Sequence, residues 1–121
     1  MNALQIEQFV RGFYHVKFQG VFSCDTLPPN PQLLVCNTDP HDKNSLDCHL
    51  RAVFKDYMNK HCRHWTFNRR KLQSVLSRFC GHYCCFYCVF RCIGYDMRKI
   101  VSMFTNDTAF NDVLVHTFVC R

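Results

Sequence analysis

Cysteine and histidine are the residue types of this 121-residue chain that could act as nucleophile, base or metal ligand, with ten cysteines and seven histidines. Five cysteines lie between residues 80 and 92. Cys80 differs from the other four because it stands where a helix is predicted to begin, with Gly81 after it. The unpaired N–H groups at a helix start favour a thiolate, the reactive form of cysteine. We expect Gly81 to leave room for a substrate backbone beside the sulfur.

Metal ligation is the second use that these cysteines suggest. Zinc sites favour paired short spacings, but the one CxxC here, Cys85–Cys88, has no second pair. The "HCRH" segment at residues 61–64 could add ligands, and a small zinc protein stays an alternative. Our prediction is no metal and no cofactor, with the cysteines after Cys80 packing as small apolar residues.

Disulfides are not expected, because "MNALQIEQFV" has no basic region followed by an apolar stretch and so does not resemble a secretory signal. No run of residues approaches the length of a membrane span, about 20 apolar residues. We therefore expect an intracellular protein, in the cytoplasm or nucleus, that is not secreted and has no membrane partner.

Apolar spacing and turn residues predict the elements of a single α/β (α+β) domain over residues 1–121. Helices are expected over 3–10, over 50–61, over 80–92 with Gly94 ending it, and from Met97 with Asp96 as N-cap. Extended segments are expected over 14–25 with a turn or bulge at Gly20, and over 33–36, 64–68 and 112–119. The prolines of "TLPPNPQ" exclude regular structure there.

Positive charge is concentrated in one stretch. The chain carries a net charge of +6, and residues 51–71 hold seven positive residues against Asp56 alone, with Tyr57, Trp65 and Phe67 between them. We predict that Arg63, Arg69, Arg70 and Lys71 are exposed on one face and contact the phosphates of DNA, without sequence preference and in a salt-dependent manner. The simpler alternative is a solvated helix face followed by a basic turn.

Several segments together resemble the adenovirus-type (adenain-like) cysteine proteases, in particular those of Maverick/Polinton-type DNA elements, which are related to the ubiquitin-like-protein proteases. In "LQSVLSRFCGHYC" a glutamine, Gln73, precedes Cys80 by seven residues, and the helix starts C-G-x-x-C. The segments "FQGVFSCDTLP", "CNTDPHDK" and "NKHCRHWTFNRRKLQS" resemble other family motifs in the family's order, so that the resemblance covers nearly all of residues 18–119.

The resemblance implies a papain-like fold, with a central helix on a small sheet, and a catalytic role for each matching residue. Cys80 would attack a peptide carbonyl, and a histidine would hold its thiolate and protonate the leaving amine. Gln73 would donate to the oxyanion, a contact worth about 3 kcal/mol. An acidic residue would orient the histidine, and Asp47 is its match.

The chain departs from the family between residues 44 and 47, where the strand that carries the catalytic histidine is missing. This apparent internal deletion removes part of the sheet, and His49 is the best substitute for the base. We therefore predict a cysteine endopeptidase that processes precursor polypeptides of a viral-like element, degenerate in this truncated form. The alternative is a catalytically dead relic or basic module that binds nucleic acid.

Overall fold

The structure, a computed structural model, describes residues 1–13, 18–23, 25–37, 47–74 and 77–120, with backbone only for residues 37 and 47–53. The chain forms two compact units, one of Met1–Phe18 with Asn68–Arg121 and the other of Gln19–Phe67. Here they are called the helical unit and the strand-containing unit, and each is described by itself.

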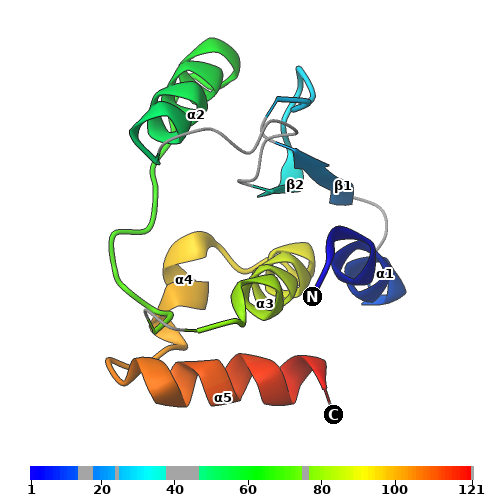
Figure 1. Cartoon of the computed structure of the whole chain (residues 1–121), viewed down its shortest axis with the longest axis vertical. Helices are drawn as coiled ribbons and strands as arrows, with labels where there is room; N and C mark the ends of the chain where they lie inside the picture. The colour runs from blue at the N-terminus through cyan, green and yellow to red at the C-terminus, as the bar shows by residue number, and fades with distance from the viewer. Residues whose placement is uncertain (14–17, 24, 38–46, 75–76, 121) are drawn as a thin grey trace. The chain divides into compact units, whose positions relative to one another are not determined.

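Helices dominate the first unit, and both strands belong mainly to the second (Figure 1). The helical unit contains α1 (Ala3–Phe13), α3 (Cys80–Ile93), α4 (Met97–Ser102) and α5 (Thr108–Val119). The strand-containing unit holds β1 (Phe18–Ser23), which starts at the last residue of the first segment, β2 (Leu33–Asn37) and α2 (Asp47–His61). This mixture confirms the predicted α+β class. Among the described helices, none combines the length and the hydropathy needed to cross a membrane.

Helix α3 is the centre of the helical unit, because it packs against α1, α4 and α5 (Figure 1). Phe86 of α3 forms a buried cluster with Ile100, Phe104 and Val115 from the segments that follow it. Burying each of these side chains contributes about 1.5–3 kcal/mol to the stability of the fold. The predicted helix from Cys80 is confirmed, and its packing partners in this unit are helices rather than the expected sheet.

Local signals at the end of α3 work as the sequence predicts. Gly94 adopts φ of 115°, a left-handed conformation that favours glycine, and its N–H donates to the carbonyls of Phe90 at 3.2 Å and Arg91 at 3.1 Å. The Asp96 side chain then accepts a hydrogen bond from the Lys99 N–H at 2.8 Å. This N-cap starts α4 where Asp96 was expected to start a helix.

The strand predicted over residues 112–119 is wrong, because these residues belong to α5. Asp107 caps the helix by accepting from the N–H groups of Ala109 and Phe110 at 3.1 and 3.2 Å. The buried positions Asn111 and Val115 are four residues apart, which is a helical period. The β-branched residues of "DVLVHTFV" favour a strand only weakly, and packing on α3 overrides that preference.

The strand-containing unit is built around the two-stranded parallel sheet of β1 and β2. The Gln19 side chain connects the strands, donating to the Asn30 carbonyl at 2.8 Å and accepting from the Gln32 N–H at 2.7 Å. The proline-rich connection is irregular and β2 covers the predicted 33–36 strand, as expected. β1 continues through Gly20 at φ of 128°. Residues 64–68, predicted to be extended, form no strand.

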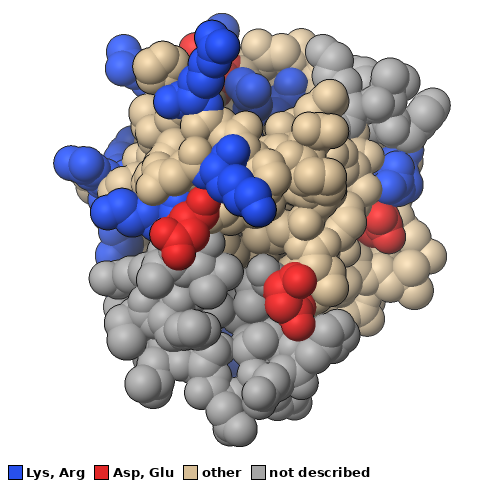
Figure 2. Space-filling model, turned by 90° about the horizontal axis from the view of Figure 1, so that it is seen from above, with Lys and Arg blue, Asp and Glu red and all other residues tan. Residues whose placement is uncertain are grey.

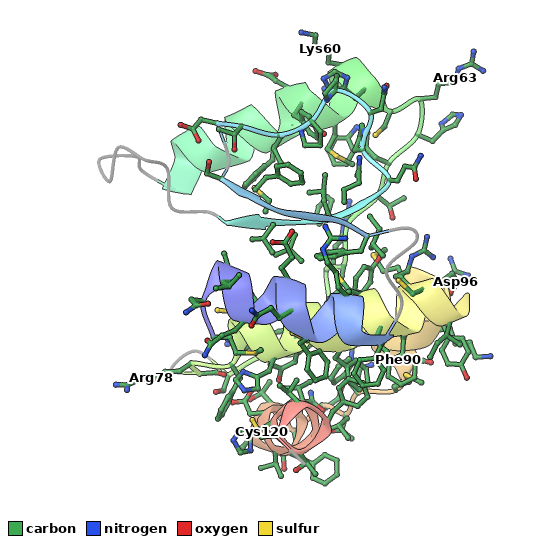
Figure 3. The ribbon with its side chains drawn as sticks, turned by 90° about the vertical axis from the view of Figure 1, so that its right-hand side faces the viewer. Lys60, Arg63, Arg78, Phe90, Asp96 and Cys120 are labelled. Carbon is green, nitrogen blue, oxygen red and sulfur yellow. The ribbon has the colours of Figure 1, made fainter. Side chains whose placement is uncertain are left out.

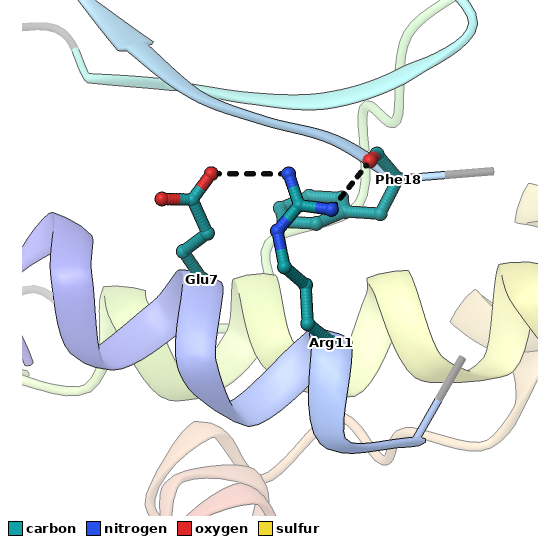
Figure 4. A network of polar contacts seen from close by, with 3 residues as sticks. All are labelled: Glu7, Arg11 and Phe18. Carbon is teal, nitrogen blue, oxygen red and sulfur yellow. Dashed lines mark hydrogen bonds and ion pairs between the residues drawn. The ribbon is translucent and has the colours of Figure 1, made fainter. Parts of the chain in front are cut away.

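In the helical unit, Arg11 connects α1 to the first residue of β1 (Figure 4). Its guanidinium donates to the Glu7 carboxylate at 3.2 Å and to the Phe18 carbonyl at 3.4 Å. The same group lies 5.5 Å from the centre of the Phe18 ring, and Phe18 is buried. A salt bridge between residues four positions apart on an exposed helix face is worth only about 0.3–0.5 kcal/mol. The Arg11 contacts therefore orient the chain more than they stabilise it.

A partly buried polar network joins α3, α5 and the segment before α3. The Asp112 carboxylate accepts from the Tyr83 hydroxyl at 2.6 Å and from the Ser74 hydroxyl at 2.7 Å. Burial alone would raise the pKa of Asp112, but these hydrogen bonds outweigh it and leave the pKa below its ordinary value. The ionised form is therefore the one that the fold stabilises.

We predict that Asp112 makes the helical unit sensitive to acid. The pKa of Asp112 in the folded chain lies below its value in the unfolded chain, about 3.9. Its contribution to the free energy of unfolding is therefore present above about pH 3.9 and is lost as the pH falls through the folded pKa. Asp112→Asn should lower the free energy of unfolding at pH 7 by about 1–3 kcal/mol. Urea denaturation at pH 7 and pH 3 should show a smaller difference for this variant than for the wild type. The exposed control Asp56→Asn should behave as wild type, and an unchanged pH difference in Asp112→Asn would contradict the assignment.

Candidate functional site

Cys80 is the first residue of α3, as predicted, and its side chain is exposed. The preceding residue, Phe79, provides no side-chain cap for the first N–H groups of the helix. Ser77 accepts from the Phe79 N–H at 3.1 Å just before the helix begins. The exposed thiol thus lies at the start of a helix that has no side-chain cap from Phe79, as the sequence predicts for Cys80.

The expected role of Gly81 is wrong in this structure. Gly81 is buried, and a Cβ atom added to it would lie 2.9 Å from the Met1 Cβ and 3.4 Å from the Ile6 Cδ1. The missing side chain therefore allows the N-terminal segment to approach α3 closely, and the space is not open to a substrate. Gly81 serves helix packing, a reason that the sequence around Cys80 did not reveal.

Gln73 is half-buried, and its amide donates to the Ser77 carbonyl at 3.3 Å. This bond lies within the segment that leads into α3, and it uses one of the two amide N–H donors. Its proposed donation to an oxyanion at Cys80 stays a prediction.

The predicted acid and base, Asp47 and His49, lie in the first turn of α2. Their side chains are outside the described residues, as is the whole of His41. Among the described residues, no histidine is hydrogen-bonded to the Cys80 thiol. His61, half-buried, lies against the Tyr57 ring at 4.8 Å, and His64 is exposed. The catalytic pair stays a prediction.

Cysteines further along α3 are packed in the interior, as the sequence indicated. Cys85 and Cys88 are 0% and 1% exposed, and Cys84 is half-buried. Burial raises the pKa of Cys84 to about 11 and that of Cys85 to about 12, and it raises the pKa of Cys88 as well. These thiols stay protonated at neutral pH. None of the eight described cysteines forms a disulfide.

Three residues that sequence analysis did not select lie together at the end of α5. One donor atom from each of His82, His116 and Cys120 lies within 4.8 Å of the other two, and Figure 3 labels Cys120 at the end of that helix. His82 is buried, and that burial, the Met1 amino group and His116 lower the pKa of His82, so its imidazole is neutral. The H-x-x-x-C spacing of His116 and Cys120 was the sequence signal for this group. Helical geometry brings residues at this spacing close together, whereas the strand predicted there would hold them apart.

The four basic residues predicted to form one exposed face divide into two kinds. Arg63, Arg69 and Lys71 are exposed, and Lys and Arg side chains cover more of the face in Figure 2 than Asp and Glu do. Arg70 is half-buried, so its expected exposure is wrong, and its contact with DNA stays a prediction. Its guanidinium donates to the carbonyls of Val101 at 3.2 Å and Phe104 at 2.9 Å, so it stabilises the end of α4 and the segment that follows.

A shallow hollow in the strand-containing unit combines positive charge with an aromatic ring. It is lined by Arg63, His64, Trp65 and Thr66. The Trp65 indole N–H donates to the Asn59 side chain at 2.9 Å, which fixes the ring. An immobilised indole beside an arginine is a surface on which a nucleic-acid base can stack while a phosphate is neutralised.

In comparisons with known proteins, no family model, curated protein or solved structure matches the chain.

We predict that the exposed cysteines react with an alkylating reagent faster than the buried ones. Brief treatment of the native chain with iodoacetamide at pH 8, followed by peptide mass analysis, should modify Cys80 and Cys120 before Cys85 and Cys88. The buried thiols are both inaccessible and protonated, so they should react only after unfolding in urea. Equal rates at Cys80 and Cys88 would contradict the described position of α3.

Arg70→Ala should destabilise the helical unit, whereas Lys71→Ala should not. The arginine donates to carbonyls that would otherwise lose their partner, and a hydrogen bond from a charged group contributes about 1.5–3 kcal/mol. Urea denaturation of both variants measures the difference. If Lys71→Ala, the neighbouring exposed control, lost as much free energy of unfolding, the structural role of Arg70 would be refuted.

Proposed function

We propose that the chain is a domain of the adenovirus-type cysteine protease family, with Cys80 as the nucleophile. The observation that supports this most is the position of Cys80 as the exposed first residue of a helix whose remaining cysteines are buried or half-buried. In the proposed reaction, the Cys80 thiolate adds to a peptide carbonyl, and the Gln73 amide donates to the resulting oxyanion. The substrate class is a precursor polypeptide of a viral-like DNA element.

In the same proposal, this form of the chain turns over little or no substrate. Turnover needs a base within hydrogen-bond reach of the thiol, at about 2.6–3.2 Å. Among the described residues no histidine makes that contact with Cys80. The papain-like arrangement is the proposed fold, with the strand that supplies the base missing between residues 44 and 47. The protein acts inside the cell, where cysteine thiols remain reduced.

Restoring the missing segment tests this proposal. We predict that the genomic DNA between the codons of Lys43 and Asp47 encodes a further strand with a histidine. The 121-residue chain should not cleave a pooled library of quenched fluorogenic peptides, and the chain with the segment restored should cleave it. Replacing Gln73 by Ala in the restored chain should lower kcat about 10²–10³-fold, the usual effect of losing one oxyanion donor.

Cys80→Ala in the restored chain is the matched control and should abolish cleavage. A restored chain that does not cleave, or that cleaves equally well after Cys80→Ala, would refute the proposal. Cleavage by the 121-residue chain that is lost in both Cys80→Ala and His49→Ala would instead show an active enzyme with His49 as its base.

Nucleic-acid binding is the second candidate function, and the hollow at Trp65 favours it specifically. Arg63 and Trp65 line this hollow together. The centre of the Phe67 ring lies 6.4 Å from the centre of the Trp65 ring. Stacking of a base on an aromatic side chain is worth about 1–3 kcal/mol. A strand of DNA would contribute the stacking base and the phosphates, with little sequence preference.

For this second function, we predict that Arg63→Glu weakens binding to single-stranded DNA and reduces the slope of log K against log salt by about 0.7, the value for one phosphate contact on a single strand. Trp65→Ala should weaken binding at every salt concentration. Fluorescence anisotropy with a labelled oligonucleotide measures both, and Arg98→Glu, an exposed change in the helical unit, serves as control. Absence of DNA binding by the wild type at low salt would exclude this function.

A further inference from the structure

We propose that His82, His116 and Cys120 bind one zinc ion, a site that does not depend on the protease proposal. The Cys120 Sγ and the His82 Nε2 lie 3.8 Å apart. One donor atom from each of the three residues lies within 4.8 Å of the others. Around tetrahedral zinc, with bonds of about 2.0–2.1 Å to nitrogen and 2.3 Å to sulfur, donor atoms are about 3.3–3.7 Å apart. Small side-chain rotations therefore complete the geometry.

His82 and His116 lie on two helices, and Cys120 is the C-cap residue that directly follows α5. His116 and Cys120 are four residues apart, and the Cys120 N–H donates to the His116 carbonyl at 2.8 Å, which continues the last turn of α5. His82 is the third residue of α3, and α3 packs directly on α5. The Phe79 ring lies 5.1 Å from the His82 ring and 5.3 Å from the His116 ring, which limits the rotation of both imidazoles.

His82 presents one ring nitrogen, Nε2, to the proposed site, where it lies beside the Cys120 sulfur. Only 8% of the His82 surface is exposed, and its Nδ1 has no hydrogen-bond partner among the described residues. Zinc at Nε2 would leave Nδ1 unpaired, so the proposal rests on the placement of Nε2 close to the donor atoms of His116 and Cys120.

The donor set selects the ion and the type of site. Two imidazoles and a thiolate suit zinc, whereas calcium and magnesium prefer oxygen ligands. His116 and Cys120 are both exposed, so the fourth position around the ion would face solvent and hold a water molecule. Zinc binding would displace the thiol proton of Cys120 into solvent, and the zinc–sulfur bond would form without any change of oxidation state.

The other zinc ligands that the sequence suggested do not converge in this way. Among the described histidines, cysteines, aspartates and glutamates, the group at the end of α5 is the one set of three or more whose donor atoms lie close enough to share an ion. The "HCRH" segment contributes His61, Cys62 and His64, which form no such group. That segment therefore provides matched controls of the same residue types.

The test uses the full 121-residue chain, reduced and freed of metal, with zinc chloride as the probe. We expect one zinc ion per chain by elemental analysis after gel filtration, and a higher Tm with zinc than without it. Cobalt(II) in place of zinc should give a thiolate-to-cobalt charge-transfer band. Zinc should also protect Cys120 from iodoacetamide while leaving Cys80 reactive, which is a readout independent of any activity.

His116→Ala and Cys120→Ser are the informative variants, because both residues are exposed and their replacement should leave the fold intact by circular dichroism. Each should weaken zinc binding at least about 10–100-fold, the loss already typical when a residue outside the coordination shell is replaced. Cys120→Ser should also abolish the cobalt–thiolate band. The controls Cys62→Ser and His64→Ala should bind zinc as the wild type does. No zinc binding, unchanged binding in His116→Ala and Cys120→Ser, or loss of binding in the two controls would each overturn the proposal.

Discussion

The helical unit depends on the burial of α3. This helix carries apolar side chains on most of its sides, so it is stable only when other elements surround it. Helices α1, α4 and α5 supply that cover. Because the body of α3 is enclosed, its first residue is where a reactive thiol can reach solvent, and the cysteines that follow are buried or half-buried. One packing constraint thus separates an exposed Cys80 from the structural cysteines behind it.

Local signals let the sequence predict the elements that begin and end at capping residues. Gly94 and Asp96 mark the end of one helix and the start of the next, because each acts on backbone groups within a few residues. α5 could not be predicted in the same way. Asp107 caps its start, but its sequence is rich in β-branched residues, and the packing of Val115 into the core against Phe86 favours the helix over a strand.

In the candidate site, too, neighbouring residues determine some features and residues far away in the sequence determine others. The position of Cys80 could be predicted, since a helix start is a local property. The burial of Gly81 could not, because Met1 and Ile6, far away in the sequence, fill the space above it. Arg70 was assigned to the DNA-binding face from the charge of its neighbours, yet its hydrogen-bond partners are carbonyls 31 and 34 residues later. Charge density along a sequence does not reveal such partners.

Cys80 and His82 stand two positions apart on α3, and this spacing separates the two proposed chemistries. Two steps along a helix turn a side chain by about 200°, so the residues face nearly opposite directions. Cys80 is exposed at the helix start, whereas His82 is buried on the side that meets α5. A zinc ion held by His82 would therefore leave the Cys80 thiol uncoordinated, and loss of the zinc ligands need not change the reactivity of Cys80. The start of α3 can carry both functions because helix geometry directs them to different surfaces.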